Sequence, residues 1–274
     1  MEGTTDAPGP RLLCSTAPFF RQPLREAFRH IAAAGYDAVE VMVTQDPATQ
    51  EPHLLRDLAR QFGLSVEAIH APFLLVTRRV WGTEPTAKVY RAVHLAESVG
   101  ARLVVIHPPY RWQTRFRRWV ESRLVDFSER TGVTVAVENM FPIPLPGQRS
   151  VRLHAPTDFE DVEPLPHLVL DTSHAAVAGL DIQAFFRRHH DRIRHLHLSN
   201  NAGRGWDSHL PVHVPGVLPL EDFLSHVVSN SFAGSLALEL DLRPWMRDER
   251  ALHDVLVRSR EFCQRYLRAG APGR

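Results

Sequence analysis

The chain has 274 residues, a length that fits one barrel domain or two smaller domains. Its hydrophobic content of 44% supports a large core, and its formal net charge of +1 does not require a polyanionic partner. No apolar run reaches the length of a membrane span, and the two cysteines are too few for a disulfide framework. Residues 1–10 lack the basic and apolar regions of a secretory signal, so we expect a cytoplasmic protein without a membrane partner.

The basic residues are almost all arginine. Of the 32 Lys and Arg residues, Lys88 is the only lysine, and its helical surroundings predict a solvated surface position. Schiff-base chemistry therefore has almost no candidate residue. The chain also lacks the G-x-S-x-G elbow, the P-loop and the dinucleotide-binding fingerprint, which argues against the enzyme classes that depend on them.

Short apolar runs alternate with amphipathic stretches along the chain. The expected strands are Arg11–Thr16, Asp37–Val43, Leu64–Ala71, Arg102–His107, Val133–Glu138, His167–Asp171, Ile193–Leu198 and Ser235–Leu240. The expected helices are Leu24–Ala34, Pro52–Phe62, Thr86–Val99, Arg115–Thr131, Ile182–His190, Leu220–Val228 and Glu249–Arg268. Eight such strands in regular alternation with helices favour a closed parallel (β/α)8 barrel over an open doubly wound sheet. We place this single α/β TIM barrel at residues 11–268, between a flexible N-terminal segment (1–10) and a C-terminal tail (269–274).

Two connections are longer than a barrel requires. Met140–Pro156 follows the fifth strand and is rich in proline, and Asn200–Pro219 follows the seventh and is rich in glycine and proline. Both are expected on the catalytic face, where long loops often cover a substrate. An irregular surface loop fits each of them equally well.

Ligand-type side chains gather where the expected strands end, which is the catalytic face of such barrels. The candidates for holding a metal are His70, His107, Glu138, Asp171, His174, His197, Asp207, His209 and Glu239. Carboxylates that close apolar strands are costly to bury together without a cation. Imidazole and carboxylate ligands suit Zn²⁺ or Mn²⁺, so we predict at least one divalent ion and as many as three.

Three further features adjoin these residues. His195 and His197 point the same way on one strand, and His197, nearer the mouth, is the better ligand, whereas His195 is expected deeper in the core or behind the ligands. Glu40 closes the second strand as a substrate contact or as a hydrogen-bonded structural carboxylate. Arg111 and Trp112 open a basic, aromatic segment that is suited to grip a substrate phosphate or nucleic acid.

We favour a plainer interpretation of that segment. It reads as the start of an amphipathic helix, with Phe116 and Trp119 packed inward and the arginines in solvent.

On these residues the sequence resembles the xylose isomerase-like barrel superfamily, which includes sugar isomerases and epimerases and the endonuclease IV type of repair enzyme. The resemblance covers Leu12 to Leu267, and its most specific parts are His70-Ala71-Pro72, His107-Pro108, Glu138-Asn139, Asp171-x-x-His174, His197 and Glu239. In the isomerase and epimerase branch it implies one metal, held by Glu138, Asp171, His197 and Glu239. There Glu138 and Glu239 would move the substrate proton as the catalytic pair, and His174 would contact substrate oxygens.

The endonuclease IV branch uses three zinc ions, and the resemblance supplies a candidate for each ligand. His70, His107 and Glu138 would serve one ion; Glu138, Asp171, His197 and Glu239 a second; and His174, Asp207 and His209 the third. The segments Cys14-Ser15-Thr16 and Val39-Glu40-Val41 depart from this branch, because they lack its His-bearing start and its DNA-contacting loop. The near-neutral charge also disfavours a duplex-binding surface.

These observations predict a metal-dependent sugar or sugar-phosphate isomerase or epimerase. The alternative is a multinuclear zinc phosphodiester hydrolase acting on nucleic acid or a small phosphoester, and a non-catalytic ligand-binding barrel is the least favoured reading. We expect a small-molecule substrate, with nucleic acid not favoured. Barrels of this type often pair, so a homo-oligomer is compatible with the sequence.

Overall fold

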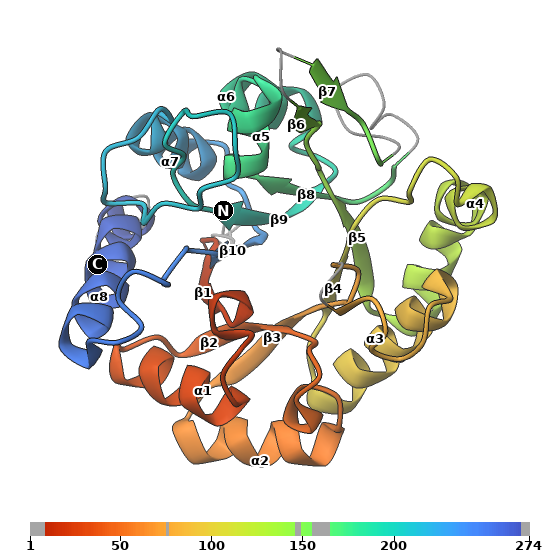
Figure 1. The fold of residues 1–274 in the computed structure, drawn as a ribbon, viewed down its shortest axis with the longest axis horizontal. Helices are drawn as coiled ribbons and strands as arrows, with labels where there is room; N and C mark the ends of the chain where they lie inside the picture. The colour runs from red at the N-terminus through yellow and green to blue at the C-terminus, as the bar shows by residue number, and fades with distance from the viewer. Residues whose placement is uncertain (1–8, 75–76, 146–148, 155–164, 270–274) are drawn as a thin grey trace, which may run out of the picture.

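The architecture is a closed parallel β-barrel surrounded by helices (Figure 1). The computed structural model describes residues 9–74, 77–145, 149–154 and 165–269. The eight barrel strands pair in the order β1-β10-β9-β8-β5-β4-β3-β2, and β2 closes onto β1. Their bounds are β1 (Arg11–Ser15), β2 (Ala38–Met42), β3 (Ser65–His70), β4 (Leu103–Ile106), β5 (Thr134–Glu138), β8 (Leu168–Asp171), β9 (Ile193–Leu198) and β10 (Ser235–Leu238). The predicted single TIM barrel is confirmed. Most of the expected N-terminal segment and C-terminal tail lies outside the described residues.

Helices follow the strands around the outside of the barrel (Figure 1). Their bounds are α1 (Leu24–Ala33), α2 (Pro52–Phe62), α3 (Pro85–Val99), α4 (Thr114–Thr131), α5 (Thr172–Ala178), α6 (Ile182–His189), α7 (Leu220–Ser229) and α8 (Glu249–Ala269). Gly63 and Gly100 end α2 and α3 with φ of 66° and 83°, a left-handed conformation that glycine adopts without strain. Within the described residues, no helix is long and apolar enough to span a membrane.

The core has two layers, because successive strand residues face opposite sides of the sheet. One set packs between the strands and the helices. The other fills the barrel interior and consists of Leu13, Ala38, Ala68, Leu103, Val105, Ala136, Val169 and Ala237. Half of these are alanines, whose small side chains suit the confined interior, and the next inward positions along the strands lie toward the C-terminal mouth.

The two long connections contain more order than the sequence indicated. The first holds an antiparallel hairpin, β6 (Ile143–Leu145) and β7 (Arg149–Val151), and its residues 146–148 and 155–156 lie outside the described range. The second folds back through a bridge between Asn200 and Leu210. Both connections follow C-terminal strand ends, as expected, and a covering role for them remains a prediction.

The single lysine does not lie where the sequence placed it. Lys88 is 3% exposed, and its ammonium group donates to the carbonyl oxygens of Pro72, Thr77 and Arg78. The expectation of a solvated surface position was wrong, because helical periodicity does not reveal a neighbouring loop whose carbonyl groups need a donor. Lys88 therefore ties the connection after β3 to helix α3.

Candidate metal centre

The inward-facing positions change from apolar to ionisable toward the C-terminal ends of six strands. Two residues beyond an apolar floor residue on each of these strands come Glu40, His70, His107, Glu138, Asp171 and Glu239. His197 on β9 joins them from the same side. The two-residue period of a strand therefore turns these side chains into the barrel interior near its C-terminal mouth, with Glu40 level with the floor residue Ala68.

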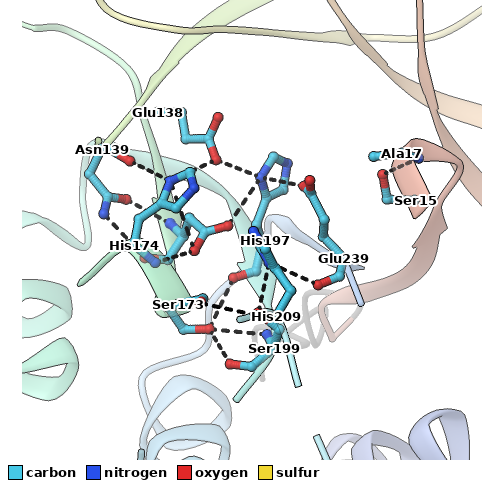
Figure 2. Close-up of polar contacts among 12 residues, drawn as sticks. Ser15, Ala17, Glu138, Asn139, Ser173, His174, His197, Ser199, His209 and Glu239 are labelled. Carbon is cyan, nitrogen blue, oxygen red and sulfur yellow. Dashed lines mark hydrogen bonds and ion pairs between the residues drawn. The ribbon is translucent and has the colours of Figure 1, made fainter. Parts of the chain in front are cut away.

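The central group gathers around the imidazole of His197 (Figure 2). Its Nδ1 lies 3.0 Å from Glu138 Oε1, 3.2 Å from Glu239 Oε2 and 3.8 Å from Asp171 Oδ2. His197, Glu138 and Asp171 are buried, and the Glu239 side chain keeps 20% of its surface exposed. The structure thus brings together the four residues that the sequence assigned to one metal.

Glu138 also faces a second group of imidazoles. Its Oε2 lies 3.5 Å from His70 Nε2 and 3.3 Å from His107 Nε2, whereas its Oε1 faces His197. Both additional histidines are 3% exposed. The Glu138 carboxylate therefore lies between two groups of ligands, with one oxygen toward each.

A third group forms around Asp207. Its Oδ2 lies 3.3 Å from His174 Nε2 and 2.7 Å from His209 Nε2, and its Oδ1 accepts a hydrogen bond from Ser173 Oγ at 2.6 Å. Asp171 connects this group to the central one, because its Oδ1 caps α5 through the His174 amide at 2.7 Å while its Oδ2 faces His197. All nine predicted metal ligands thus lie in three adjoining groups.

In several histidines of the cluster, a hydrogen bond from Nδ1 to a backbone carbonyl fixes the tautomer of the ring. Backbone carbonyl oxygens lie at 3.1 Å from His70 Nδ1, 2.9 Å from His174 Nδ1 and 3.1 Å from His209 Nδ1. A carbonyl oxygen only accepts, so each Nδ1 must carry a proton. In the neutral ring this leaves Nε2 with a free lone pair directed into the cluster, as a metal ligand requires.

Burial and mutual contact perturb the acids and bases strongly. Burial raises the pKa of Asp171 and of Glu239. Burial also opposes ionisation of Glu138, but the neighbouring histidines, His197 foremost, outweigh it and hold the pKa of Glu138 well below its usual range. Burial lowers the pKa of His107 to about 4, so this ring is neutral at physiological pH.

The carboxylate oxygens of the cluster that lack a hydrogen-bond partner among the described residues fit a divalent metal, independently of the family resemblance. Glu138 Oε2, Asp171 Oδ2 and Glu239 Oε2 are buried and accept no hydrogen bond from any described residue. Orphaned carboxylate oxygens of this kind are costly unless a cation compensates them. Ligand atoms from Asp171, His197 and Glu239 lie within 4.8 Å of one another, as do those of His70, Glu138 and His197 and those of Asp171, His174 and His209.

Glu40 and His195 lie beneath the cluster rather than in the mouth. Both are 0% exposed, and Glu40 Oε2 contacts His195 Nε2 at 3.0 Å and His197 Nε2 at 3.1 Å. Of the two roles the sequence left open for Glu40, this geometry matches the hydrogen-bonded carboxylate, and a substrate contact by Glu40 remains a prediction. His195 occupies the deeper position expected for it.

Arg111 and Trp112 lie outside the cluster, on the connection before α4. Trp112 is 66% exposed and stacks on Tyr110 with ring centres 4.8 Å apart. Phe116 is buried and Trp119 is partly buried against the core, as the amphipathic-helix interpretation expected. A substrate contact by Arg111 or Trp112 remains a prediction.

Sequence reasoning missed one residue that organises the site. Asn139 follows Glu138; its Oδ1 accepts from the Asp171 amide at 2.6 Å and its Nδ2 donates to the Asp171 carbonyl at 3.1 Å. This side chain therefore fixes the end of β8 against the end of β5. The Glu138-Asn139 pair was visible in the sequence, but a double contact with another strand end was not.

A cavity of about 450 Å³ opens beside the exposed edge of the cluster. Glu239, Asp207 and His209 line one side of it. Apolar side chains that include Phe19, Met42 and Met246 line another part. The cavity therefore offers a small molecule access to the central and third groups.

Comparisons with known proteins agree with this architecture. Residues 28–263 match the family model described as xylose isomerase-like TIM barrel. An uncharacterised protein of Mycobacterium leprae is 33% identical over 92% of this chain and 96% of its own length.

Solved structures share the fold at lower sequence identity. A D-tagatose 3-epimerase-like protein has a TM-score of 0.68 at 19% identity, covering 93% of this chain and 98% of its own. The IolI protein with a bound zinc atom has a TM-score of 0.68 at 18% identity, with 93% and 99% covered. An AP endonuclease of family 2 from Brucella melitensis has a TM-score of 0.64 at 19% identity, with 87% and 99% covered. The family match and the mycobacterial relative together show that the chain belongs to the xylose isomerase-like TIM barrel family.

Proposed function

We propose that this chain is a phosphoester hydrolase with a multinuclear divalent-metal centre, in which Zn²⁺ is the favoured ion. One observation carries the proposal: two carboxylates, Glu138 and Asp171, each adjoin two different ligand groups. Glu138 faces His197 with Oε1 and the His70–His107 pair with Oε2. Asp171 faces His197 with Oδ2, its Oδ1 accepts from the His174 amide, and it also offers a ligand atom within 4.8 Å of those of His174 and His209. A single ion needs only the central group, whereas carboxylates shared in this way suit neighbouring ions.

Hydrolysis of a phosphoester follows from such a centre. Divalent ions held a few ångström apart act as Lewis acids that stabilise both the attacking and the leaving oxygen of a phosphoryl displacement. The chain's own contribution is to hold His70, His174 and His209 in fixed tautomers and to keep His107 neutral. The cavity beside Glu239 would admit a small phosphoester, and the near-neutral charge makes a long nucleic acid the less favoured substrate.

A sugar or sugar-phosphate isomerase or epimerase, ranked first on sequence, is the second candidate. Two observations favour it. Glu138 and Glu239 both contact Nδ1 of His197, and one structure with the same fold is named as a D-tagatose 3-epimerase-like protein. Glu239, partly exposed and with its pKa raised by burial, is well placed to hold a proton. Glu138 is less so, because it is 2% exposed and its carboxylate is occupied by several imidazoles.

The two candidates separate in a paired assay of purified, metal-loaded protein. We expect hydrolysis of bis(4-nitrophenyl) phosphate or 4-nitrophenyl phosphate and no interconversion of ketohexoses or their phosphates. His107→Gln should abolish most of this hydrolysis, because it removes a ligand outside the central group. His53→Gln, at an exposed position on α2, is the matched control and should retain full activity. Epimerisation that survives His107→Gln would establish the second candidate instead.

A further inference from the structure

We infer that Glu40 is a positioning residue for the metal centre, holding His197 so that its Nδ1 lone pair points at the central group. This inference rests on the proposed metal centre but concerns a residue outside the ligand set. Glu40 comes from β2 and His197 from β9, and β1 and β10 lie between these strands in the barrel. The contact therefore spans the barrel interior directly beneath the mouth.

Both oxygens of Glu40 are engaged. Oε2 lies 3.1 Å from His197 Nε2 and 3.0 Å from His195 Nε2. Oε1 lies 3.2 Å from Ser15 Oγ, which itself accepts a hydrogen bond from the Ala17 amide at 3.2 Å. Since the Ala17 amide can only donate, the Ser15 hydroxyl proton is free to point at Glu40.

This arrangement determines where His197 is protonated. An unprotonated Nε2 would turn its lone pair toward the Glu40 carboxylate, which is unfavourable at 3.1 Å in a fully buried position. Nε2 therefore carries a proton and donates it to Glu40. By the same reasoning Nδ1, 3.0 Å from Glu138 Oε1, carries a second proton in the metal-free chain, which a bound metal would displace. When a metal is bound, Nδ1 is the nitrogen left to ligate, and it already faces Glu138, Asp171 and Glu239.

His195 completes the same network from below. Its Nε2 lies near the shared Glu40 oxygen, and its Nδ1 lies 2.6 Å from Ser235 Oγ, where the serine hydroxyl can donate. Glu40 then receives a hydrogen bond from each of two buried side chains, His197 and Ser15, while His195 Nε2 lies 3.0 Å from it without hydrogen-bond geometry. A carboxylate held this firmly can restrain the His197 ring against rotation.

A competing interpretation is that Glu40, His195 and His197 form a metal site themselves, since their ligand atoms lie within 4.8 Å of one another. The donor assignments above satisfy the Glu40 oxygens and His197 Nε2 without an ion, whereas His195 Nε2 has no hydrogen-bond partner among the described residues. The two interpretations differ in the number of ions that the chain loses when Glu40 is changed, so one experiment distinguishes them.

The test is a titration of the metal-free protein with Zn²⁺ against a chromophoric chelator, together with the visible absorption of the Co²⁺-loaded protein. We expect Glu40→Gln to keep the ion count while weakening the central Zn²⁺ affinity about 10- to 100-fold, with a changed Co²⁺ spectrum. Ser15→Ala, which removes one donor to Glu40 but leaves the carboxylate, should weaken it less. Glu249→Gln makes the same chemical change at an exposed residue paired with Arg29 and should alter neither quantity.

Circular dichroism of each metal-free variant shows whether it folds. If Glu40→Gln does not fold, Glu40→Asp provides the test, because it keeps the charge but withdraws the oxygens from His197. Unchanged affinity in the folded Glu40 variant would overturn the inference, and so would loss of a whole ion in both Glu40→Gln and His195→Gln. A wild-type chain that binds no divalent ion would overturn the proposed function together with this inference.

Discussion

At the scale of single residues, Glu138 is the most connected acid of the site. Its two oxygens face separate imidazole groups, and it is 2% exposed. Glu138→Gln removes the charge that both groups share. We expect at least about a 100-fold loss of hydrolytic activity and the loss of more than one bound ion, because replacing even a supporting residue typically costs 10- to 100-fold. Glu249→Gln is the control, and loss of only one ion would show that Glu138 serves a single metal.

His209 gives the metal-free chain a measurable pH dependence. Burial lowers the pKa of this imidazole, but the ion pair with Asp207 outweighs it and raises the pKa to about 9. The unfolded chain returns to an ordinary value of about 6.5, so the folded state binds the proton more tightly. The stabilisation is complete below about pH 6.5 and is lost as the pH rises toward 9.

Urea unfolding of the metal-free protein at pH 6, 7.5 and 9 measures this loss. We expect the fall between pH 6 and 9 to be reduced in His209→Gln. An equally steep fall in that variant would assign the effect to another group.

At the scale of elements, the connection after β3 depends on Lys88. The ammonium group donates to carbonyl oxygens of Pro72, Thr77 and Arg78, and Leu74 of the same connection lines the cavity. Lys88→Met leaves these acceptors without their donor, which should lower the free energy of unfolding by about 2–4 kcal/mol. Arg91→Met, at an exposed position on α3, is the control for chemical denaturation. Equal stability of the two variants would contradict the anchoring role.

The helices and strands also show which elements the sequence pattern could predict and which it could not. The eight strands and the longer helices were predictable, because their apolar periodicity extends over several residues. Helix α5 was missed because it has seven residues and begins directly after β8, where Asp171 caps it and also faces His197. The β6–β7 hairpin was missed because proline-rich segments rarely indicate strands. Asn139 and Lys88 act through contacts distant in sequence, which periodicity cannot reveal.

At the scale of the whole molecule, barrel closure makes much of the site predictable. Once eight parallel strands form a ring, residues at their C-terminal ends must converge, so the ligand candidates at the strand ends could be expected at one mouth. The division of the nine candidates into three groups came from the family resemblance. The resemblance had already assigned Glu138 to two of these groups, but it did not show which carboxylate oxygen faces which group. That Glu138 and Asp171 each face two groups depends on which carboxylate oxygen points where, and this changed the ranking of the two functions.

Metal ions held by residues from six strands should also stabilise the entire barrel. Binding to the folded chain alone adds about 2.7 kcal/mol when free metal is 100 times the dissociation constant. We therefore expect the thermal midpoint to fall by several degrees when EDTA removes the metal and to recover when Zn²⁺ is restored. Asp207→Asn, which weakens only the third group, should show a smaller recovery. An unchanged midpoint after complete metal removal would contradict this expectation.

The central claim is that this barrel holds neighbouring ions through shared carboxylates. The most direct test is an anomalous difference map, at the zinc absorption edge, of crystals grown with Zn²⁺. The account predicts two or three peaks at the C-terminal mouth, with Glu138 ligating one ion through each oxygen. A single peak surrounded by Glu138, Asp171, His197 and Glu239, with His70 and His107 unligated, would contradict it.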